Sequence, residues 1–219
     1  MSFLINPYRF GGIAPALVEY IGSSVIGSAG TTGNTIALPS GSASGDLAIF
    51  TSSGNSTAKT TNTPAGWTRI LSYTGLLQSL YAFYKVLDSG DITAGSVTIT
   101  YNTSNVYGQI VMYSLRGADS GTITLSTPYA DDVVSTAHTS SSKTGGADDF
   151  LISVHSVRAL VGVSSVPSGM TAGAGNAGVG MSKHTAYLNQ AGTPTGDKTL
   201  TLAAGSSGKV GLQIGVSPA

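Results

Sequence analysis

The sequence predicts an all-β fold, a jelly-roll-like β-sandwich built from two pseudo-symmetric repeats. Three observations lead to this prediction. Apolar residues recur with a period of two along most of the chain, which is the pattern of β-strands. Ser, Thr and Gly account for 31, 26 and 30 of the 219 residues, and so many small residues disfavour long helices. The third observation is an internal repeat with an offset of about 103 residues.

The clearest strand signatures are runs of β-branched and aromatic residues bounded by Gly, Ser, Asp or Pro. They cover residues 46–50, 96–101, 107–115 and 198–202. Residues 13–20 and 75–79 are the candidate helices, of about two turns and one turn. Residues 162–180, which are rich in Gly and Ser, are predicted to form a flexible surface loop.

The repeat is clearest at a Pro-x-Gly turn, where residues 64–68 (PAGWT) return as residues 167–171 (PSGMT). The same offset carries Asp46 onto Asp149, Leu47 onto Phe150, Ile49 onto Ile152, Tyr84 onto Tyr187, Val97 onto Leu200 and Ile99 onto Leu202. One residue is then lost, and an offset of 102 carries Ile110 onto Leu212 and Met112 onto Ile214. The two halves therefore share one plan.

This plan predicts how the halves pack. The few strands of one half would leave an apolar face in water, whereas two sheets packed face to face close a common core about 10 Å thick. We therefore expect a single sandwich domain over residues 13–219, with repeat halves at about 13–117 and 118–219. The alternative is two tandem small barrels joined near residues 116–121. The absence of a flexible linker there favours the single sandwich.

Composition excludes several classes of protein. Charged residues make up only 9% of the chain, and ten Lys and Arg balance ten Asp and Glu, so the basic surface of a nucleic-acid-binding protein is missing. The chain has no Cys, which excludes disulfides and thiolate metal sites. It has no apolar run of membrane-helix length and no signal-peptide pattern at its start. We expect a soluble protein made in the cytoplasm, without membrane insertion.

No catalytic motif accompanies the three histidines, His138, His155 and His184. The chain has no Gly-x-Ser-x-Gly elbow and no His spacing of a metal site. His155 lies in a strand-like run and is expected to be solvent-facing or hydrogen-bonded. Residues 173–178 match G-x-G-x-x-G but sit in an all-β context, so the match does not indicate a nucleotide site. We predict no catalytic residue, no cofactor and no metal site.

The carboxylates are mostly in turn-like sequence. Asp88 and Asp91 share a four-residue Asp-Ser-Gly-Asp segment that could hold Ca²⁺, although a plain turn is the favoured interpretation because Asp and Gly are common turn residues. Asp46 and Asp149 occupy equivalent positions at strand starts. This placement indicates hydrogen bonds that cap a loop rather than catalysis.

The aromatic residues raise the question of sugar stacking. Trp67 follows a turn, but Met170 replaces it in the second half, which a core position tolerates and a stacking platform does not. We therefore predict that Trp67 packs in the core. Tyr107 and Tyr129 remain candidates for contact with a ligand or partner.

The first twelve residues stand outside the repeat. They are rich in aromatic and turn residues and end in Gly11-Gly12, which marks a hinge. We expect a docking arm over residues 1–12, and the alternative is a tail that folds back on its own domain. The arm residues are Leu4, Ile5, Asn6, Pro7, Tyr8, Arg9 and Phe10.

These residues carry a resemblance to structural proteins of tailed-bacteriophage virions. Residues 4–11 (LINPYRFG) resemble the N-termini of such proteins. Residues 45–49 (GDLAI), 64–68 (PAGWT) and 81–86 (YAFYKV) resemble a pattern of phage structural and fibre-like proteins. The resemblance covers roughly residues 1–12 and 45–116 and brings no catalytic residue with it.

The resemblance implies a non-enzymatic structural protein on the virion exterior, assembled in the host cytoplasm. The first expectation is a tail-fibre or appendage module that contributes to host attachment. It would be a homo-oligomer, with a homotrimer favoured, whose arm binds other virion proteins and whose loops face a host-surface glycan or protein. The alternative is a capsid decoration (cement) protein, and a more distant one is a carbohydrate-binding module or glycan-active enzyme.

Overall fold

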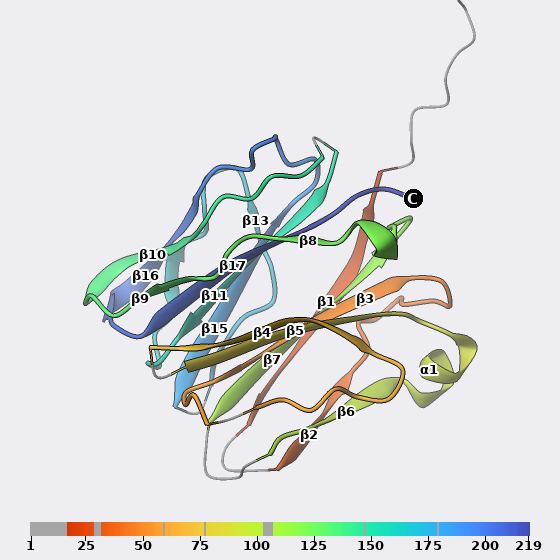
Figure 1. Cartoon of the computed structure of the whole chain (residues 1–219), viewed down its shortest axis with the longest axis horizontal. Helices are drawn as coiled ribbons and strands as arrows, with labels where there is room; N and C mark the ends of the chain where they lie inside the picture. The colour runs from red at the N-terminus through yellow and green to blue at the C-terminus, as the bar shows by residue number, and fades with distance from the viewer. Residues whose placement is uncertain are drawn as a thin grey trace, which may run out of the picture.

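Figure 1 shows the computed structural model of the protein, which describes residues 17–28, 32–58, 60–76, 78–102, 107–146, 148–178 and 180–219. Antiparallel strands form nearly all of its regular structure. The described residues add one short α-helix and one 3-10 turn. The predicted all-β sandwich class is confirmed.

The first half, residues 17–117, forms two sheets. The first large sheet has the order β1-β7-β3-β5-β4, and the first small sheet pairs β2 with β6. The strands are β1 (Glu19–Ser28), β2 (Gly33–Ala37), β3 (Leu47–Gly54), β4 (Thr68–Gly75), β5 (Gln78–Val86), β6 (Ser96–Thr100) and β7 (Gly108–Arg116), with helix α1 (Ser89–Ala94) before β6. The chain therefore crosses between two sheets as in a jelly roll.

The second half, residues 118–219, is built in the same way. The second large sheet has the order β13-β15-β11-β17-β8, with β14 beside β15 and β9 beside β17, and the second small sheet has the order β10-β16-β12. The elements are η1 (Ser120–Thr122), β8 (Thr124–Leu125), β9 (Tyr129–Asp131), β10 (Ser135–Ser140), β11 (Phe150–Val157), β12 (Val163–Ser165), β13 (Thr171–Ala172), β14 (Asn176–Gly178), β15 (Met181–Leu188), β16 (Lys198–Ser206) and β17 (Lys209–Val216).

The four sheets stack as small, large, large and small layers (Figure 1). The two large sheets enclose the inner core, to which both halves contribute large apolar residues. The opposite face of each large sheet is covered by the small sheet of its own half, which encloses a first and a second outer core. The expected face-to-face packing of the repeats is therefore present, but each half is also a sandwich by itself. A single two-sheet jelly roll over the whole chain does not describe this arrangement.

The strand pairing shows which residues of the two halves are equivalent. Thr51 pairs with Ala82 in the first large sheet as Val154 pairs with Thr185 in the second, which corresponds to an offset of 103. The irregularity next to this pair also recurs, because β4 and the β13–β14 segment each shift by one residue against their neighbour. A residue of one half can therefore be compared directly with its counterpart in the other.

The offset of 102 expected for the last strand is wrong. Val111 pairs with Thr51 and Leu212 pairs with Val154, so Val111 and Leu212 are equivalent at an offset of 101. Both face the inner core, whereas Ile110 faces the first outer core. Strand β7 is apolar on both faces, so its apolar pattern does not alternate, although that of β17 does. A one-residue slip of β7 against β17 therefore leaves no trace in the sequence.

Three local predictions are also wrong. Residues 19 and 20 of the first candidate helix begin β1, and residues 13–16 lie outside the described part of the chain. The second candidate helix, residues 75–79, falls on the hairpin between β4 and β5. The predicted loop 162–180 contains β12, β13 and β14. These are short strands at sheet edges, where backbone pairing rather than apolar alternation decides the structure.

The repeated Pro-x-Gly segments form the same turn in both halves. Trp67 donates its N–H to the Pro64 carbonyl at 3.1 Å, and the equivalent bond from Met170 measures 3.0 Å. Gly66 and Gly169 both have φ of 77°. Only Gly adopts this conformation readily, which is why a type II turn has Gly at its third position.

The molecule has two distinct ends. At the entry end, where the described chain begins, Glu19 of β1 pairs with Arg116, the last residue of β7. Strands β3 and β11 both finish at the opposite end, the loop end. There the Gln78 side-chain amide of the first half donates a hydrogen bond to the Gly208 carbonyl of the second half. Both halves therefore turn corresponding loops toward the same end.

Candidate functional site

All three histidines of the chain lie in the second outer core. His155 on β11 pairs directly with His184 on β15, and His138 comes from β10 of the small sheet. Their exposed fractions are 0%, 8% and 1% respectively. Neighbouring strands of an antiparallel sheet place directly paired side chains on the same face. The fold therefore gathers residues that are 17 to 46 positions apart in the chain.

His155 is part of a chain of hydrogen bonds. Its Nε2 lies 2.8 Å from Ser153 Oγ, which lies 2.7 Å from Ser140 Oγ. The hydrogen-bonded alternative for His155 is confirmed, and the solvent-facing alternative is wrong because the small sheet covers this face. Burial lowers the pKa of His155 to about 3, with a smaller contribution from the charge of His184, so the ring is neutral at pH 7.

His138 packs edge-on against His155, with ring centroids 4.8 Å apart and an interplanar angle of 80°. Burial is the main cause that lowers the pKa of His138 well below its ordinary value, and the nearby backbone of Val210 opposes this shift. Neither ring nitrogen of His138 reaches a partner at normal hydrogen-bond geometry within the described ranges. The described residues also contain no cluster of three His, Cys, Asp or Glu side chains suited to a metal ion.

A fully buried lysine anchors the neighbouring segment at the loop end. Lys209 Nζ donates to Ser135 Oγ at 2.5 Å and to the Ala137 carbonyl at 2.9 Å, and it lies 3.0 Å from the Asp131 carboxylate. The hydrogen bond from the Val133 N–H is the main cause that lowers the pKa of Asp131, and the hydrogen bond from Lys209 is the second. The segment between β9 and β10 is therefore tied firmly to β17.

The Asp at the start of β3 is buried and fully engaged. Asp46 accepts a hydrogen bond from the Ala43 N–H at 2.8 Å, so the predicted loop-capping role is confirmed. Arg116, whose side chain is 46% exposed, donates to both carboxylate oxygens at 2.9 Å. Such a two-pronged Arg–carboxylate contact is geometrically specific.

The equivalent Asp149 has a different set of partners. Ser217 stands in the place of Arg116 and donates to the carboxylate at 2.7 Å. Lys143 supplies the positive charge at 3.0 Å, and both charged side chains are only 1% exposed. The Asp149 carboxylate therefore bonds to two side chains where the Asp46 carboxylate accepts a backbone N–H, while the Asp149 N–H holds the loop by donating to the Gly146 carbonyl at 3.3 Å.

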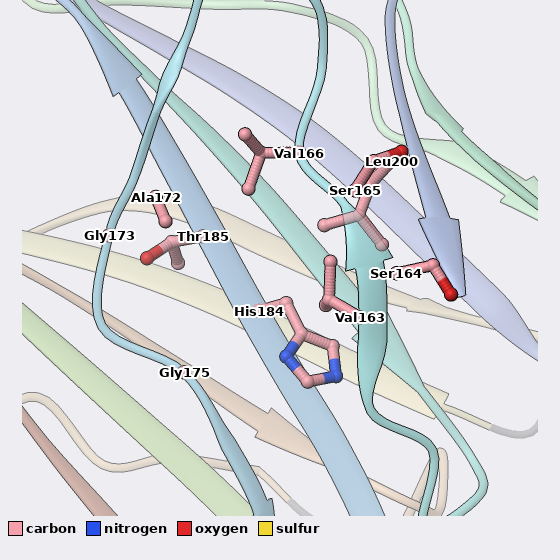
Figure 2. A pocket seen from close by; sticks show the side chains of 10 residues that line it. All are labelled: Val163, Ser164, Ser165, Val166, Ala172, Gly173, Gly175, His184, Thr185 and Leu200. Carbon is pink, nitrogen blue, oxygen red and sulfur yellow. The ribbon is translucent and has the colours of Figure 1, made fainter. Parts of the chain in front are cut away.

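A cavity of about 370 Å³ opens between β12 and the β13–β14 segment (Figure 2). It is lined by Val163, Ser164, Ser165, Val166, Ala172, Gly173, Gly175, His184, Thr185 and Leu200. His184 Nε2 lies 2.7 Å from the Val161 carbonyl. A carbonyl oxygen only accepts, so Nε2 carries the proton. Burial lowers the pKa of His184, and the neutral ring therefore keeps Nδ1 as an unprotonated acceptor.

Two glycines keep the β13–β14 wall of the cavity close to β15. Gly173 donates its N–H to the Thr185 carbonyl at 2.9 Å, and a side chain at this position would collide with the Thr185 hydroxyl. A Cβ at Gly175 would lie 3.1 Å from His184 Nδ1. No Ser hydroxyl among the described residues hydrogen-bonds to His184, so a nucleophile–base pair is not formed here. The arrangement is suited to binding.

A second buried polar group lies in the inner core. Lys183 is completely buried, and its nearest acceptor in the described chain is the Gln109 carbonyl at 3.5 Å. Burial lowers the pKa of Lys183 well below its ordinary value. On the facing sheet, Thr51 Oγ1, Ser53 Oγ and Gln109 Oε1 have no hydrogen-bond partner among the described residues. Such a group is costly to bury without a partner.

The other candidate residues have varied outcomes. The docking-arm residues Leu4, Ile5, Asn6, Pro7, Tyr8, Arg9 and Phe10 lie outside the described residues.

Asp88 and Asp91 form a capping box at the start of α1, and Lys85 Nζ lies 3.1 and 2.7 Å from their carboxylates. The segment is therefore a helix start rather than a plain turn. A lysine ammonium already occupies the place of a cation.

The aromatic residues singled out in the sequence differ in their burial. Trp67 is buried and packs edge-to-face on Phe50, with centroids 4.8 Å apart, so its predicted core role is confirmed. Met170 is buried at the equivalent position. Tyr107 and Tyr129 are 39% and 42% exposed and stay candidates for partner contact.

Sequence reasoning missed the cavity and the buried lysines. One signal was available, since an alignment of the halves at the offset of 103 places His184 on Tyr81 and Lys183 on Leu80. When a polar residue of one half aligns with an apolar residue of the other half, the role of that core position differs between the halves.

Comparisons with protein-family models, with curated protein sequences and with solved structures each find no match to this chain. Among the described residues, no helix is long and apolar enough to cross a membrane.

Proposed function

We propose that the protein is a non-enzymatic structural protein on the exterior of a tailed-phage virion, where it serves as a tail-fibre or appendage module that contributes to host attachment. The proposal begins from the resemblance of residues 4–11 and 45–116 to phage structural proteins. Among the described residues the cavity of this β-sandwich has no nucleophile–base pair, which agrees with a structural role.

The observation that carries the proposal is the placement of exposed apolar side chains. Val133, Val134 and Leu160 are 68%, 72% and 61% exposed. They lie in the loops that follow β9 and β11, at the loop end. The described chain begins at the opposite, entry end. Among the described residues these three have the largest exposed fractions of the large apolar side chains, and we infer that the loop end contacts a partner.

The supporting structure keeps these loops in place. The Lys209 contacts with Ser135 and Asp131 hold the base of the segment that carries Val133 and Val134. A preorganised loop loses less conformational entropy when it binds a partner. In the proposed arrangement the arm docks into the particle, three copies associate, and the loops face the host.

Location on the particle tests the proposal directly. Gold-labelled antibodies against the purified chain are applied to intact particles, beside particles assembled in cells that produce only a chain lacking residues 1–12. Label at the tail tip or on fibres supports the proposal, and the truncated chain should be folded but absent from particles. Label spread over the capsid would identify a decoration protein instead. No label on any particle overturns both structural roles.

Host attachment is tested with a loop variant. We expect V133S/V134S particles to assemble normally but to adsorb to host cells more slowly. Val86→Ser is the matched control, because Val86 is 44% exposed and lies at the end of β5, at the entry end. Equal adsorption of the loop variant and the control would contradict a role of the loop end in attachment.

A further inference from the structure

The cavity beside His184 occupies a place that an aromatic ring fills in the first half. Tyr81, the counterpart of His184, is 1% exposed and pairs with Ser72 across strands β5 and β4. Ser72 is the counterpart of Gly175. The second half therefore has a shorter ring and a glycine where the first half has a tyrosine and its partner. The replacement of these two groups opens the space.

The residues that line the cavity define what it can hold. None of them carries a formal charge at pH 7, because the His184 ring is neutral. Val163, Val166 and Leu200 form an apolar wall, and Ser164 and Ser165 stand at the exposed rim. Binding pockets of small molecules combine such apolar walls with a few placed polar groups and have volumes of roughly 300–1,000 Å³.

His184 supplies the most specific polar group. Because its Nε2–H is held by the Val161 carbonyl, its Nδ1 is fixed as an acceptor for a hydroxyl donor. Figure 2 shows the ring between Val163 on one side and Gly175 on the other, and both of these residues line the cavity. Nδ1 lies on the Gly175 side of the ring. The neighbouring Ser hydroxyls can both donate and accept.

We propose that this cavity binds one pyranose residue of an uncharged glycan, with a sugar hydroxyl donating to His184 Nδ1 and the apolar ring face against Val163 and Val166. A pyranose is uncharged, carries several hydroxyls and presents C–H groups on one face, which matches the lining in each respect. An acidic sugar finds no cation in this lining. The inference deepens the proposed function by naming a receptor class, and its test uses the purified chain, so the two can fail separately.

The first experiment follows the three histidine rings by NMR. Methyl pyranosides of glucose, galactose, mannose, N-acetylglucosamine and rhamnose are titrated into the full chain. We expect at least one sugar to shift the His184 ring signals in a saturable way. The buried His138 and His155 rings should stay unchanged and serve as internal controls. No saturable shift of His184 with any of the five sugars overturns the proposal.

Two variants test whether the sugar binds in this cavity. His184→Tyr introduces the ring that fills this place in the first half, and Ser164→Trp blocks the rim from an exposed position. Ser168→Trp is the matched control, because Ser168 is exposed and nearby in sequence but does not line the cavity. We expect affinity for the sugar to fall about tenfold or more in S164W and to be unchanged in S168W.

The outcomes separate cleanly. If H184Y does not fold, S164W decides the question, since its rim position leaves the core intact. Unchanged affinity in a folded S164W would show that the sugar binds elsewhere and would overturn the proposal. Loss of sugar binding in S164W, together with normal incorporation of this variant into particles, would support the cavity as a site separate from the docking arm.

Discussion

The two outer cores have the same strand framework but opposite chemistry. The first contains Phe50, Trp67, Tyr81 and Phe83, whose rings stack or meet edge-to-face at centroid distances of 4.6–6.4 Å. The equivalent positions of the second hold Ser153, Met170, His184 and Ala186. One framework therefore tolerates a dry aromatic core on one side and a polar, partly hollow core on the other, because the shared inner core supports both.

The buried carboxylates at the strand starts repeat this contrast. Asp46 is neutralised by Arg116, which stays half-exposed, whereas Asp149 is neutralised by Lys143 inside the protein. The chain thus keeps the carboxylate in both halves but changes the source of the positive charge. The second half depends on a buried pair, which is more sensitive to the loss of one partner.

The largest expected effect comes from exchanging one core residue between the halves. Phe50→Ser, which copies Ser153, removes a fully buried ring and leaves a hydroxyl without a partner. We expect a loss of about 5 kcal/mol in the free energy of unfolding, from the cavity and the unsatisfied hydroxyl together. Urea unfolding followed by circular dichroism measures it. A loss below about 1 kcal/mol would show that the two cores are less different than their residues indicate.

A smaller effect is expected when the buried charge pair is broken. Lys143→Met leaves Asp149 buried with Ser217 as its remaining partner and should cost about 3–5 kcal/mol of unfolding free energy. The counterpart variant Arg116→Met should lose less, because water can reach the Asp46 site through the exposed Arg116 position. Equal losses in the two variants, measured by urea unfolding, would contradict the contrast between the pairs.

Making the halves more alike should stabilise the protein at one position. Lys183→Leu copies Leu80 and removes a buried amine whose nearest acceptor is 3.5 Å away. We expect a gain of roughly 1–3 kcal/mol in the free energy of unfolding. A loss of stability would instead indicate that Lys183 has a favourable partner in solution.

The effect of pH is the smallest of the four when it is counted for a change of one pH unit. The folded pKa of His155, about 3, lies below its ordinary value of 6.5. Between these values the unfolded chain binds a proton that the native state does not, so stability falls as pH is lowered from about 6.5, by about 1.4 kcal/mol per unit for this residue. His155→Ser, which copies Ser52, should reduce the slope of unfolding free energy against pH. An unchanged slope would show that His155 is not buried as a neutral ring.

Some features of the fold could be predicted from the sequence, and others could not. The repeat and the core role of Trp67 were readable, because turn residues and the exchange of Trp for Met leave a local signal. The register of the last strand was not readable, because its first-half counterpart β7 is apolar on both faces. The buried state of His155 was not readable either, since burial depends on the small sheet that covers it.

The sequence by itself determined the all-β class, the two equivalent halves and the turns at Gly66 and Gly169, because periodicity and backbone restriction are local properties. Only the tertiary structure decided that each half is a sandwich with its own outer core. It also decided that His138, His155 and His184 meet in one of them and that a cavity opens beside His184. These features depend on which faces are covered by strands far away in the chain, and no local pattern encodes that.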